Sequence, residues 1–242
     1  TVTIPAGTLA GSTTWGASAV EGKASFANSR LQNSFFEQVS YIGAFGDSDW
    51  TEGWANFDPQ HTNYNATTVT VAAGSLTENT TWTSNNVYLL NGFVYVPSGI
   101  TLNIQAGTVI RGDKTNKGTL IVEMGGKLIA KGTKLNPIVF TSNQAASSRA
   151  SGDWGGVILL GKSSINPAGG TSTIEGGVGR TYGGGTSPVL DDNSGNLEYV
   201  RIEFPGIAFE PNNEINGLTC GGVGSGTTLN YIQVSFSGDD SY

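Results

Sequence analysis

Two adjacent carboxylates, Asp239 and Asp240, follow an apolar segment late in the sequence. Paired acids at the end of a strand can hydrolyse glycosidic bonds, because one protonates the leaving oxygen while the other activates water. Such a site also needs a converging His or basic pair. The sequence holds one His, His61, in its aromatic-rich first part, and no Arg-x-Lys pair. We therefore predict a structural turn or a calcium ligand here, with catalysis as the alternative.

A second acidic run offers oxygen ligands of the kind that Ca²⁺ prefers, at Asp191, Asp192 and Asn193. The run lacks the spaced Asp-x-Asp-x-Asp-Gly register of an EF-hand loop. Ca²⁺ is the only cofactor that the sequence suggests. A polysaccharide lyase would also need a basic residue to remove a proton beside a carboxylate, and Arg201 and Lys162 are the candidates. Nothing in their spacing distinguishes them from solvated surface charges.

Large aromatic residues crowd the first quarter of the chain, between Phe35 and Phe57. We predict that residues 1–64 form an aromatic-rich capping or exchanged segment, which covers strand edges that would otherwise invite aggregation. The alternative is a carbohydrate-binding module in which exposed rings stack on sugars. The candidate rings for such stacking are Trp50, Trp54 and Tyr182.

The elements that would position these groups are revealed by an internal repeat. The segment LEYVRIEF at 197–204 returns as LNYIQVSF at 229–236, a constant offset of 32 residues. Each copy alternates side chains as a strand does and follows a Ser-Gly turn. We expect Glu198, Arg201 and Glu203 to face outward and the apolar residues between them to face a core. Strands that recur in this way predict stacked coils.

Fainter repeats with offsets of 18 and 19 residues occur between 101 and 129. Unequal offsets with a preserved strand pattern fit a solenoid whose loops vary in length. Glycine is abundant, with 36 residues, and helix-favouring stretches are almost absent. We therefore predict an all-β fold, a right-handed parallel β-helix over residues 65–242. Glycine-rich insertions at 142–152 and 166–195 are expected to be loops.

Composition limits the partners. The formal charge is −7, with 12 Lys and Arg against 19 Asp and Glu, so the chain lacks the clustered cations that nucleic acids or anionic membranes require. No apolar run is long enough for a membrane-spanning helix, and no signal-peptide pattern opens the sequence, so we expect a mature, soluble chain. Cys220 is alone, and its apolar setting predicts burial. Low charge with abundant Thr, Ser, Asn and Gly favours an extracellular or cell-surface location.

Several phrases resemble a family of secreted proteins from Bacteroidota, among them GDWGGVILLGKSSIN, DDNSGNLEYVRIEFPGIAFEPNNEINGLT and GGVGSGTTLNYIQVSFSGDDSY. The resemblance covers roughly residues 65–242. It implies a right-handed parallel β-helix of the pectin-lyase-like kind and export, often through type IX secretion. It implies no particular activity, because most such proteins have none assigned.

The order of two phrases departs from that family. The aromatic phrase YIGAFGDSDWTEGWANFDPQ resembles one that usually follows the solenoid, whereas here it precedes it. The Asp-Asp phrase normally continues into further coils. Either the chain is a fragment spanning two modules, or its N-terminal segment completes a neighbour's open end. The second arrangement would build an open filament.

The sequence as a whole favours a non-enzymatic structural or adhesive β-solenoid, secreted or held at the cell surface, that assembles head-to-tail into filaments. Its expected partners are further copies of itself, cell-surface components or polysaccharide. The alternatives are a polysaccharide lyase or glycoside hydrolase built on a β-helix, and a carbohydrate-binding module. The ligand, the assembly state and the completeness of the chain are not encoded in any motif.

Overall fold

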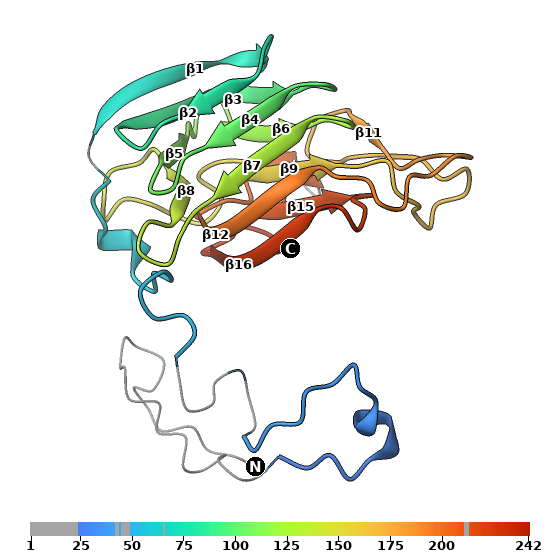
Figure 1. Ribbon diagram of the computed structural model, residues 1–242. Helices are drawn as coiled ribbons and strands as arrows, with labels where there is room; N and C mark the ends of the chain where they lie inside the picture. The colour runs from blue at the N-terminus through green and yellow to red at the C-terminus, as the bar shows by residue number, and fades with distance from the viewer. Residues whose placement is uncertain (1–23, 42–43, 45–48, 65, 211–212) are drawn as a thin grey trace. The chain divides into compact units, whose positions relative to one another are not determined.

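A computed structural model describes residues 24–41, 44, 49–64, 66–210 and 213–242. The chain divides into two compact units, residues Thr1–Phe57 and Asp58–Tyr242. Every β-strand of the described residues lies in the second unit (Figure 1). Its strands are β1 (Thr67–Ser75), β2 (Thr80–Trp82), β3 (Asn86–Val96), β4 (Thr101–Ile104), β5 (Val109–Gly112), β6 (Thr119–Val122), β7 (Lys127–Lys131), β8 (Ile138–Ser142), β9 (Val157–Leu160), β10 (Ser172–Thr173), β11 (Thr181–Tyr182), β12 (Gly195–Glu203), β13 (Ala208–Glu210), β14 (Asn213–Glu214), β15 (Leu218–Gly221) and β16 (Thr228–Ser235).

Twelve of these strands form one parallel sheet that winds into three walls. Wall 1 stacks β1, the first half of β3, β5, β8, the second half of β12 and the second half of β16. Wall 2 stacks the ends of β1 and β3 with β6, β9 and β15. Wall 3 stacks β2, β4, β7 and the first halves of β12 and β16. The predicted parallel β-helix is confirmed.

The core lies between the three walls, where alternate residues of every strand point inward. In β3 the pattern buries Tyr88, Leu90, Val94 and Val96. The ladder register places Leu90 beside Gly112 and Val94 beside Leu120, so each rung covers the apolar residues of the previous one. Stacking of the rungs therefore depends on the inward residues of the strands and not on the length of the loops between them, which explains the variable loops.

The repeat detected in the sequence corresponds to β12 and β16. The register pairs Leu197 with Leu229 and Ile202 with Val234, as the offset predicts. At the corner between wall 3 and wall 1, Tyr199 and Tyr231 both have positive φ, at 50° and 54°, and their rings stack with centroids 4.3 Å apart. Positive φ strains a residue that has a Cβ, and the face-to-face ring contact offsets part of this cost.

The aromatic residue that ends each repeat behaves in the same way. Phe204 and Phe236 have φ values of 60° and 53°, and their rings stack at 5.1 Å. By contrast, β12 begins at Gly195, with φ of 135°, where a Cβ would meet the Leu128 carbonyl oxygen at 1.9 Å. Glycine is required there because the backbone of the adjacent rung lies too close for any side chain.

The outer face of wall 2 is covered by the insertions between strands. A second apolar cluster forms there, from outward residues of β6 and β9 and from loop residues; it contains Ile121, Ile158, Leu160, Val178 and Ile215. The antiparallel pairs β10–β11 and β13–β14 belong to these insertions. The glycine-rich region after residue 166 is thus largely loop, as predicted, but part of it packs as a cover.

The prediction that Cys220 is buried is wrong, since the residue is exposed. In the ladder Cys220 lies beside Leu159, whose side chain points into the core, so Cys220 faces inward too. Among the described strands β15 has only β9 as a partner, and no further rung covers the inward face of Cys220. The apolar setting indicated the direction of the side chain correctly but not its position at the edge of wall 2.

The first unit is described only in part, and residues 1–23, 42–43 and 45–48 of the predicted cap lie outside the described residues. Within it a 3₁₀ turn, η2, spans Ser29–Gln32. Trp50 and Trp54 form a local ring pair with centroids 6.1 Å apart. Capping by this unit stays a prediction. In the described part of the chain, no helix has the length and apolarity to span a membrane.

Candidate functional site

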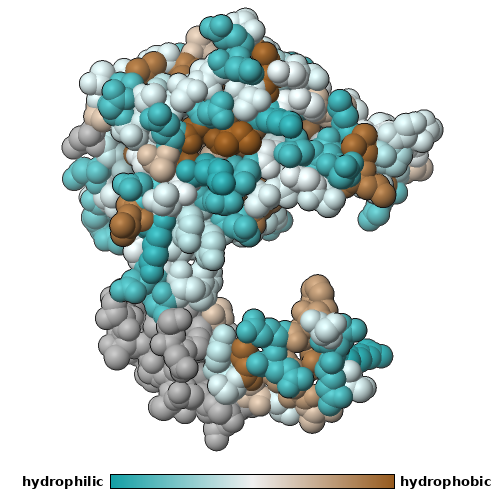
Figure 2. Space-filling view, in the orientation of Figure 1, coloured by the Kyte–Doolittle hydropathy of each residue, from teal (hydrophilic) through white to brown (hydrophobic). Residues whose placement is uncertain are grey.

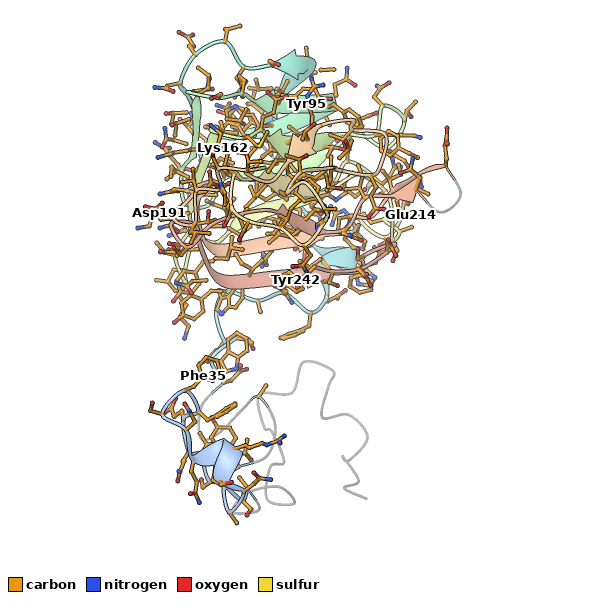
Figure 3. The ribbon with its side chains drawn as sticks, turned by 90° about the vertical axis from the view of Figure 1, so that its right-hand side faces the viewer. Phe35, Tyr95, Lys162, Asp191, Glu214 and Tyr242 are labelled. Carbon is orange, nitrogen blue, oxygen red and sulfur yellow. The ribbon has the colours of Figure 1, made fainter. Side chains whose placement is uncertain are left out.

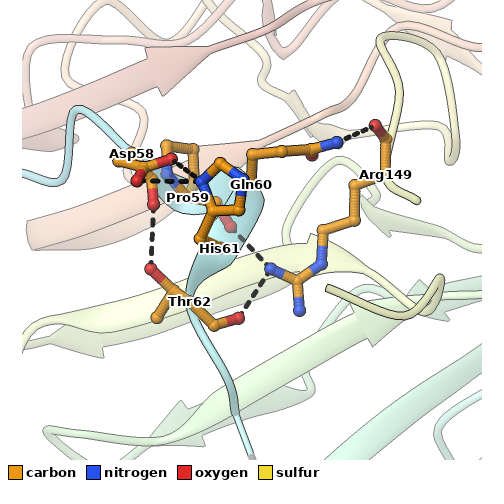
Figure 4. A network of polar contacts seen from close by, with 6 residues as sticks. All are labelled: Asp58, Pro59, Gln60, His61, Thr62 and Arg149. Carbon is orange, nitrogen blue, oxygen red and sulfur yellow. Dashed lines mark hydrogen bonds and ion pairs between the residues drawn. The ribbon is translucent and has the colours of Figure 1, made fainter. Parts of the chain in front are cut away.

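Residues 58–64, here named the strap, lie on the outer face of wall 1. The strap begins with a 3₁₀ turn, η3 (Pro59–His61), and is held by the loop between β8 and β9. The buried guanidinium of Arg149 donates to the carbonyl oxygens of Pro59 at 2.6 Å and Thr62 at 2.8 Å, and the amide of Gln60 donates to the Arg149 carbonyl at 2.9 Å (Figure 4). Side chains and loops, rather than a strand ladder, attach this segment.

The strap ends at Tyr64, whose hydroxyl donates to both carboxylate oxygens of Glu203, at 2.8 and 3.0 Å. Glu203 faces outward from β12, as the alternation predicts, yet it is 0% exposed because the strap covers it. The backbone of Glu203 is also engaged, since the Trp154 indole N–H donates to its carbonyl at 2.8 Å. The alternation in the sequence correctly predicts that the Glu203 side chain faces outward, but it does not predict that the strap covers this side chain.

Three guanidinium groups lie around Tyr64 and this carboxylate. Arg201 lies two residues before Glu203 on β12, and its Nε is 3.6 Å from Glu203 Oε1. Arg111, on β5, donates to the Tyr64 carbonyl oxygen, and Arg149 lies over the Tyr64 ring, 5.3 Å from its centroid. Burial raises the pKa of the Glu203 carboxyl, although Arg201, Tyr64, Thr141 and Arg149 act in the opposite direction. Burial and then the charge of Arg149 lower the pKa of Arg111.

A carboxyl group with a raised pKa is a common feature of general acids. Here, however, the one phenol hydroxyl of Tyr64 occupies both oxygens, and the carboxyl has no exposed surface. A glycosidic oxygen could not approach Glu203 while the strap is in place. In this arrangement the group can bind the strap and cannot transfer a proton to a substrate.

The raised pKa of Glu203 predicts a specific pH dependence. Because the folded state holds the proton more tightly than the unfolded state, stability is full below the ordinary value of 4.5 and falls as the pH rises through the folded pKa. We expect Glu203→Gln to remove this loss, worth about 1.4 kcal/mol for each unit by which the folded pKa exceeds the ordinary value. Urea unfolding of both proteins from pH 4 to pH 8 measures the difference. Parallel curves for the two proteins would contradict the expectation.

The predicted acids Asp239 and Asp240 are exposed and lie beyond β16. The Asp240 carbonyl accepts from Gly217 N at 3.0 Å and from the Ser237 hydroxyl at 3.1 Å, so its backbone belongs to a turn that pairs with the start of β15. His61, the only His, lies instead on the strap, where its Nδ1 is 2.7 Å from Asp58. The geometry gives the two acids a structural contact and brings no His contact to them.

The predicted calcium run forms a turn before β12. Asp192 is buried and accepts from the Ser194 hydroxyl at 3.3 Å, Asn193 Oδ1 accepts from Gly195 N at 2.9 Å, and Asp191 is exposed. Among the described residues no group of three or more His, Cys, Asp or Glu could hold a metal ion. Calcium binding that uses Asn193 as a third ligand stays a prediction.

The remaining predicted residues are dispersed. Trp54 is 2% exposed and Trp50 is 47% exposed, and both lie in the first unit. Tyr182 is half-buried in the second unit, with its ring against Gly221, where a Cβ would meet it at 2.8 Å. Figure 3 shows Lys162 and Asp191 toward one side of the second unit and Glu214 toward the other. Stacking of sugars on Trp50 or Tyr182 stays a prediction.

Sequence reasoning missed Tyr64, Arg111 and Arg149. The ladder offers one signal for Arg111, because β5 and β8 place it directly beside Thr141 on the outer face. An arginine in the middle of a β-helix wall, between Leu89 on β3 and Thr141, indicates that something covers or contacts that position. No comparable signal links Tyr64 to Glu203, which are 139 residues apart.

Comparison with protein families gives one result for this fold. A family model described as a pectate-lyase like beta helix domain matches residues 74–242. Its span starts within β1 and includes every later strand. Comparisons with curated proteins and with solved structures gave no match.

Proposed function

The chain belongs to the family of pectate-lyase-like β-helix domains, and on that premise we propose that it is a non-enzymatic structural or adhesive solenoid of the cell exterior. The observation that carries the proposal is the surroundings of the candidate catalytic groups, which engage them in structural contacts or leave the acids without a His partner. Glu203, the carboxyl whose pKa is most plainly shifted for acid catalysis, is covered by the strap and binds Tyr64. Asp239 and Asp240 lie exposed in a turn, and His61 pairs with Asp58.

Location outside the cell is part of the proposal, as is export by the type IX route of Bacteroidota. The support is compositional and comes from the phrases around β9, β12 and β16. In the view of Figure 2, apolar residues on the second unit form separate patches on a largely hydrophilic surface. Such a surface suits contact with water and with polar partners such as polysaccharide.

Head-to-tail assembly is supported by the two outermost strands of wall 1. Among the strands that the structure describes, both β1 and β16 have a single ladder partner in this wall. Their inward residues are only partly covered, with Val69 39% exposed and Val71, Ile232 and Val234 half-buried. Unpaired edges with apolar side chains readily accept another strand, and a contact between unlike ends extends without closing.

Electron microscopy and light scattering over a range of concentrations test the assembly. Filaments or a growing mass are expected, and Ile232→Lys on β16 should abolish them, whereas Lys127→Gln on wall 3 should not. Single particles at every concentration would contradict head-to-tail assembly. That result would leave the non-enzymatic proposal unaffected, because the two rest on different residues.

A polysaccharide lyase or hydrolase is the second candidate, since the family is described by its likeness to pectate lyase. Incubation with pectate, alginate and neutral glycans, followed by ultraviolet absorbance of unsaturated products and by a reducing-sugar assay, distinguishes the two. We expect no turnover. Turnover abolished by Asp240→Asn, and retained by Asp191→Asn, would overturn the non-enzymatic proposal.

A further inference from the structure

The charges beneath and beside the strap do not balance. Arg111 and Arg149 both contact Tyr64, the first through the Tyr64 carbonyl oxygen and the second over its ring, and Arg201 pairs with Glu203, the carboxylate that the Tyr64 hydroxyl binds. The ion pairs of the described residues include Arg201 with Glu203 and none formed by Arg111 or Arg149. Arg149 therefore shares the single carboxylate, Glu203, with Arg201, and its charge also lowers the pKa of Arg111, which forms no ion pair among the described residues.

Arg149 is the more deeply buried of the two, with 6% of its surface exposed. Its guanidinium donates to carbonyl oxygens of Pro59, Thr62 and Gln144. These are neutral dipoles, which satisfy the N–H groups but do not neutralise the charge, and Arg149 shares its one nearby carboxylate, Glu203, with Arg201. A desolvated cation of this kind attracts an anion more strongly than a solvated one does.

Arg111 is half-buried, and one of its N–H groups has no acceptor among the described residues. Its terminal nitrogen donates to the Tyr64 carbonyl, while its Nε is buried and has no hydrogen-bond partner among the described residues. A buried donor without an acceptor is costly, and a charged one more so. Its column neighbours on wall 1, Leu89 and Thr141, are neutral, so wall stacking does not itself require a cation at 111.

We propose that Arg111 and Arg149 form a binding site for a small oxyanion at the edge of the strap. A sulfate, phosphate or carboxylate group accepts several guanidinium N–H bonds at once and neutralises two neighbouring cations. The free Nε of Arg111 supplies one of those bonds. Because that atom is buried, a free ion of small size fits the site better than a group carried on a polymer.

Anion binding and strap closure are coupled in this arrangement. Both arginines hold the strap through carbonyl oxygens, Arg111 through Tyr64 and Arg149 through Pro59 and Thr62. Their mutual repulsion opposes closure, and an anion between them removes that repulsion. A ligand that binds the closed form alone stabilises it in proportion to the logarithm of its concentration. The inference is independent of the proposed function, since it requires neither assembly nor the absence of catalysis.

Thermal unfolding of the full chain in sodium phosphate, sulfate or chloride, at constant ionic strength, tests the proposal. Phosphate and sulfate should raise Tm above its value in chloride by about 2–4 °C. These salts also stabilise proteins non-specifically by exclusion from the surface. The control for that effect is Lys131→Gln, which removes a half-exposed cation from wall 3 and should retain the whole increment.

The decisive variant is Arg111→Gln, which removes one cation and the unpaired Nε. It should lose the anion-specific increment and should melt no lower than the wild type in chloride, because relief of the repulsion with Arg149 offsets the lost hydrogen bond to the Tyr64 carbonyl. A purely structural Arg111 would behave in the opposite way. A lower Tm in chloride together with an unchanged phosphate increment would overturn the proposal.

A measurement that does not depend on stability accompanies the melting curves. Titration of inorganic phosphate followed by ³¹P NMR should give saturable line broadening with the wild type and Lys131→Gln, and none with Arg111→Gln. Equal broadening by all three proteins would refute the site. Competition by oligogalacturonate or chondroitin sulfate distinguishes a glycan-borne oxyanion from a free one: displacement of phosphate by either would reassign the ligand and contradict the preference for a small ion.

Discussion

Replacing Trp154 by alanine is expected to lower the free energy of unfolding by about 3–5 kcal/mol. The side chain is fully buried, its ring stacks on Phe140 with centroids 6.4 Å apart, and its indole N–H donates to the Glu203 carbonyl at 2.8 Å. The substitution therefore leaves a cavity and an unsatisfied carbonyl oxygen together. Guanidinium chloride unfolding followed by circular dichroism measures the loss.

Two further variants separate these contributions. Trp154→Phe keeps a ring against Phe140 and loses the hydrogen bond, so it should cost less than the alanine variant. Leu135→Ala, at a residue 83% exposed, should change stability by no more than about 0.5 kcal/mol. An alanine variant at Trp154 that unfolds like the one at Leu135 would mean that the contacts of Trp154 with Phe140 and Glu203 do not stabilise the fold.

Replacing Tyr64 by alanine is expected to cost a similar amount, about 3–5 kcal/mol, and to release the strap. The change removes a buried ring and leaves the Glu203 carboxyl under a cover that no longer donates to it. Two observables follow. The unfolding free energy falls, and the backbone of the strap, residues 58–64, becomes sensitive to protease in the otherwise folded protein.

The matched variant for the hydroxyl alone is Tyr64→Phe, which should cost about 1.5–3 kcal/mol if Glu203 is ionised. Tyr242→Ala is the control for loss of an exposed tyrosine, since Tyr242 is 66% exposed. Cleavage within residues 58–64 of the wild type at the same rate as in Tyr64→Ala would show that the strap is not closed in solution.

The sequence contains enough information for the solenoid because its ladder is a local, repeated pattern. The alternation in 197–204 and its copy in 229–236 determine both register and direction, and the structure pairs Leu197 with Leu229 accordingly. The positions of the corners could also be predicted from turn glycines, and Gly99 and Gly107 indeed have positive φ. Each of these features depends on neighbours within one or two rungs.

The candidate site was beyond such reasoning because it joins segments that no repeat connects. Tyr64 meets Glu203 across 139 residues and Gln60 meets Arg149 across 89, in both cases through side chains. The strap has no periodic pattern of apolar residues, so the sequence alone assigns its residues to the aromatic-rich segment before β1. The error at Cys220 has a related cause, because side-chain direction follows from alternation while exposure depends on which rungs are present.

The match between β12 and β16 in register, corner angle and ring stack makes residues 197–228 a self-contained increment of length. An in-frame tandem duplication of the corresponding gene segment would insert one more turn of the helix, about 4.8 Å in height, whose contacts in walls 1 and 3 would repeat those between β12 and β16. Repetition of this stretch, in evolution or by design, would thus change the length of the solenoid in steps of one turn.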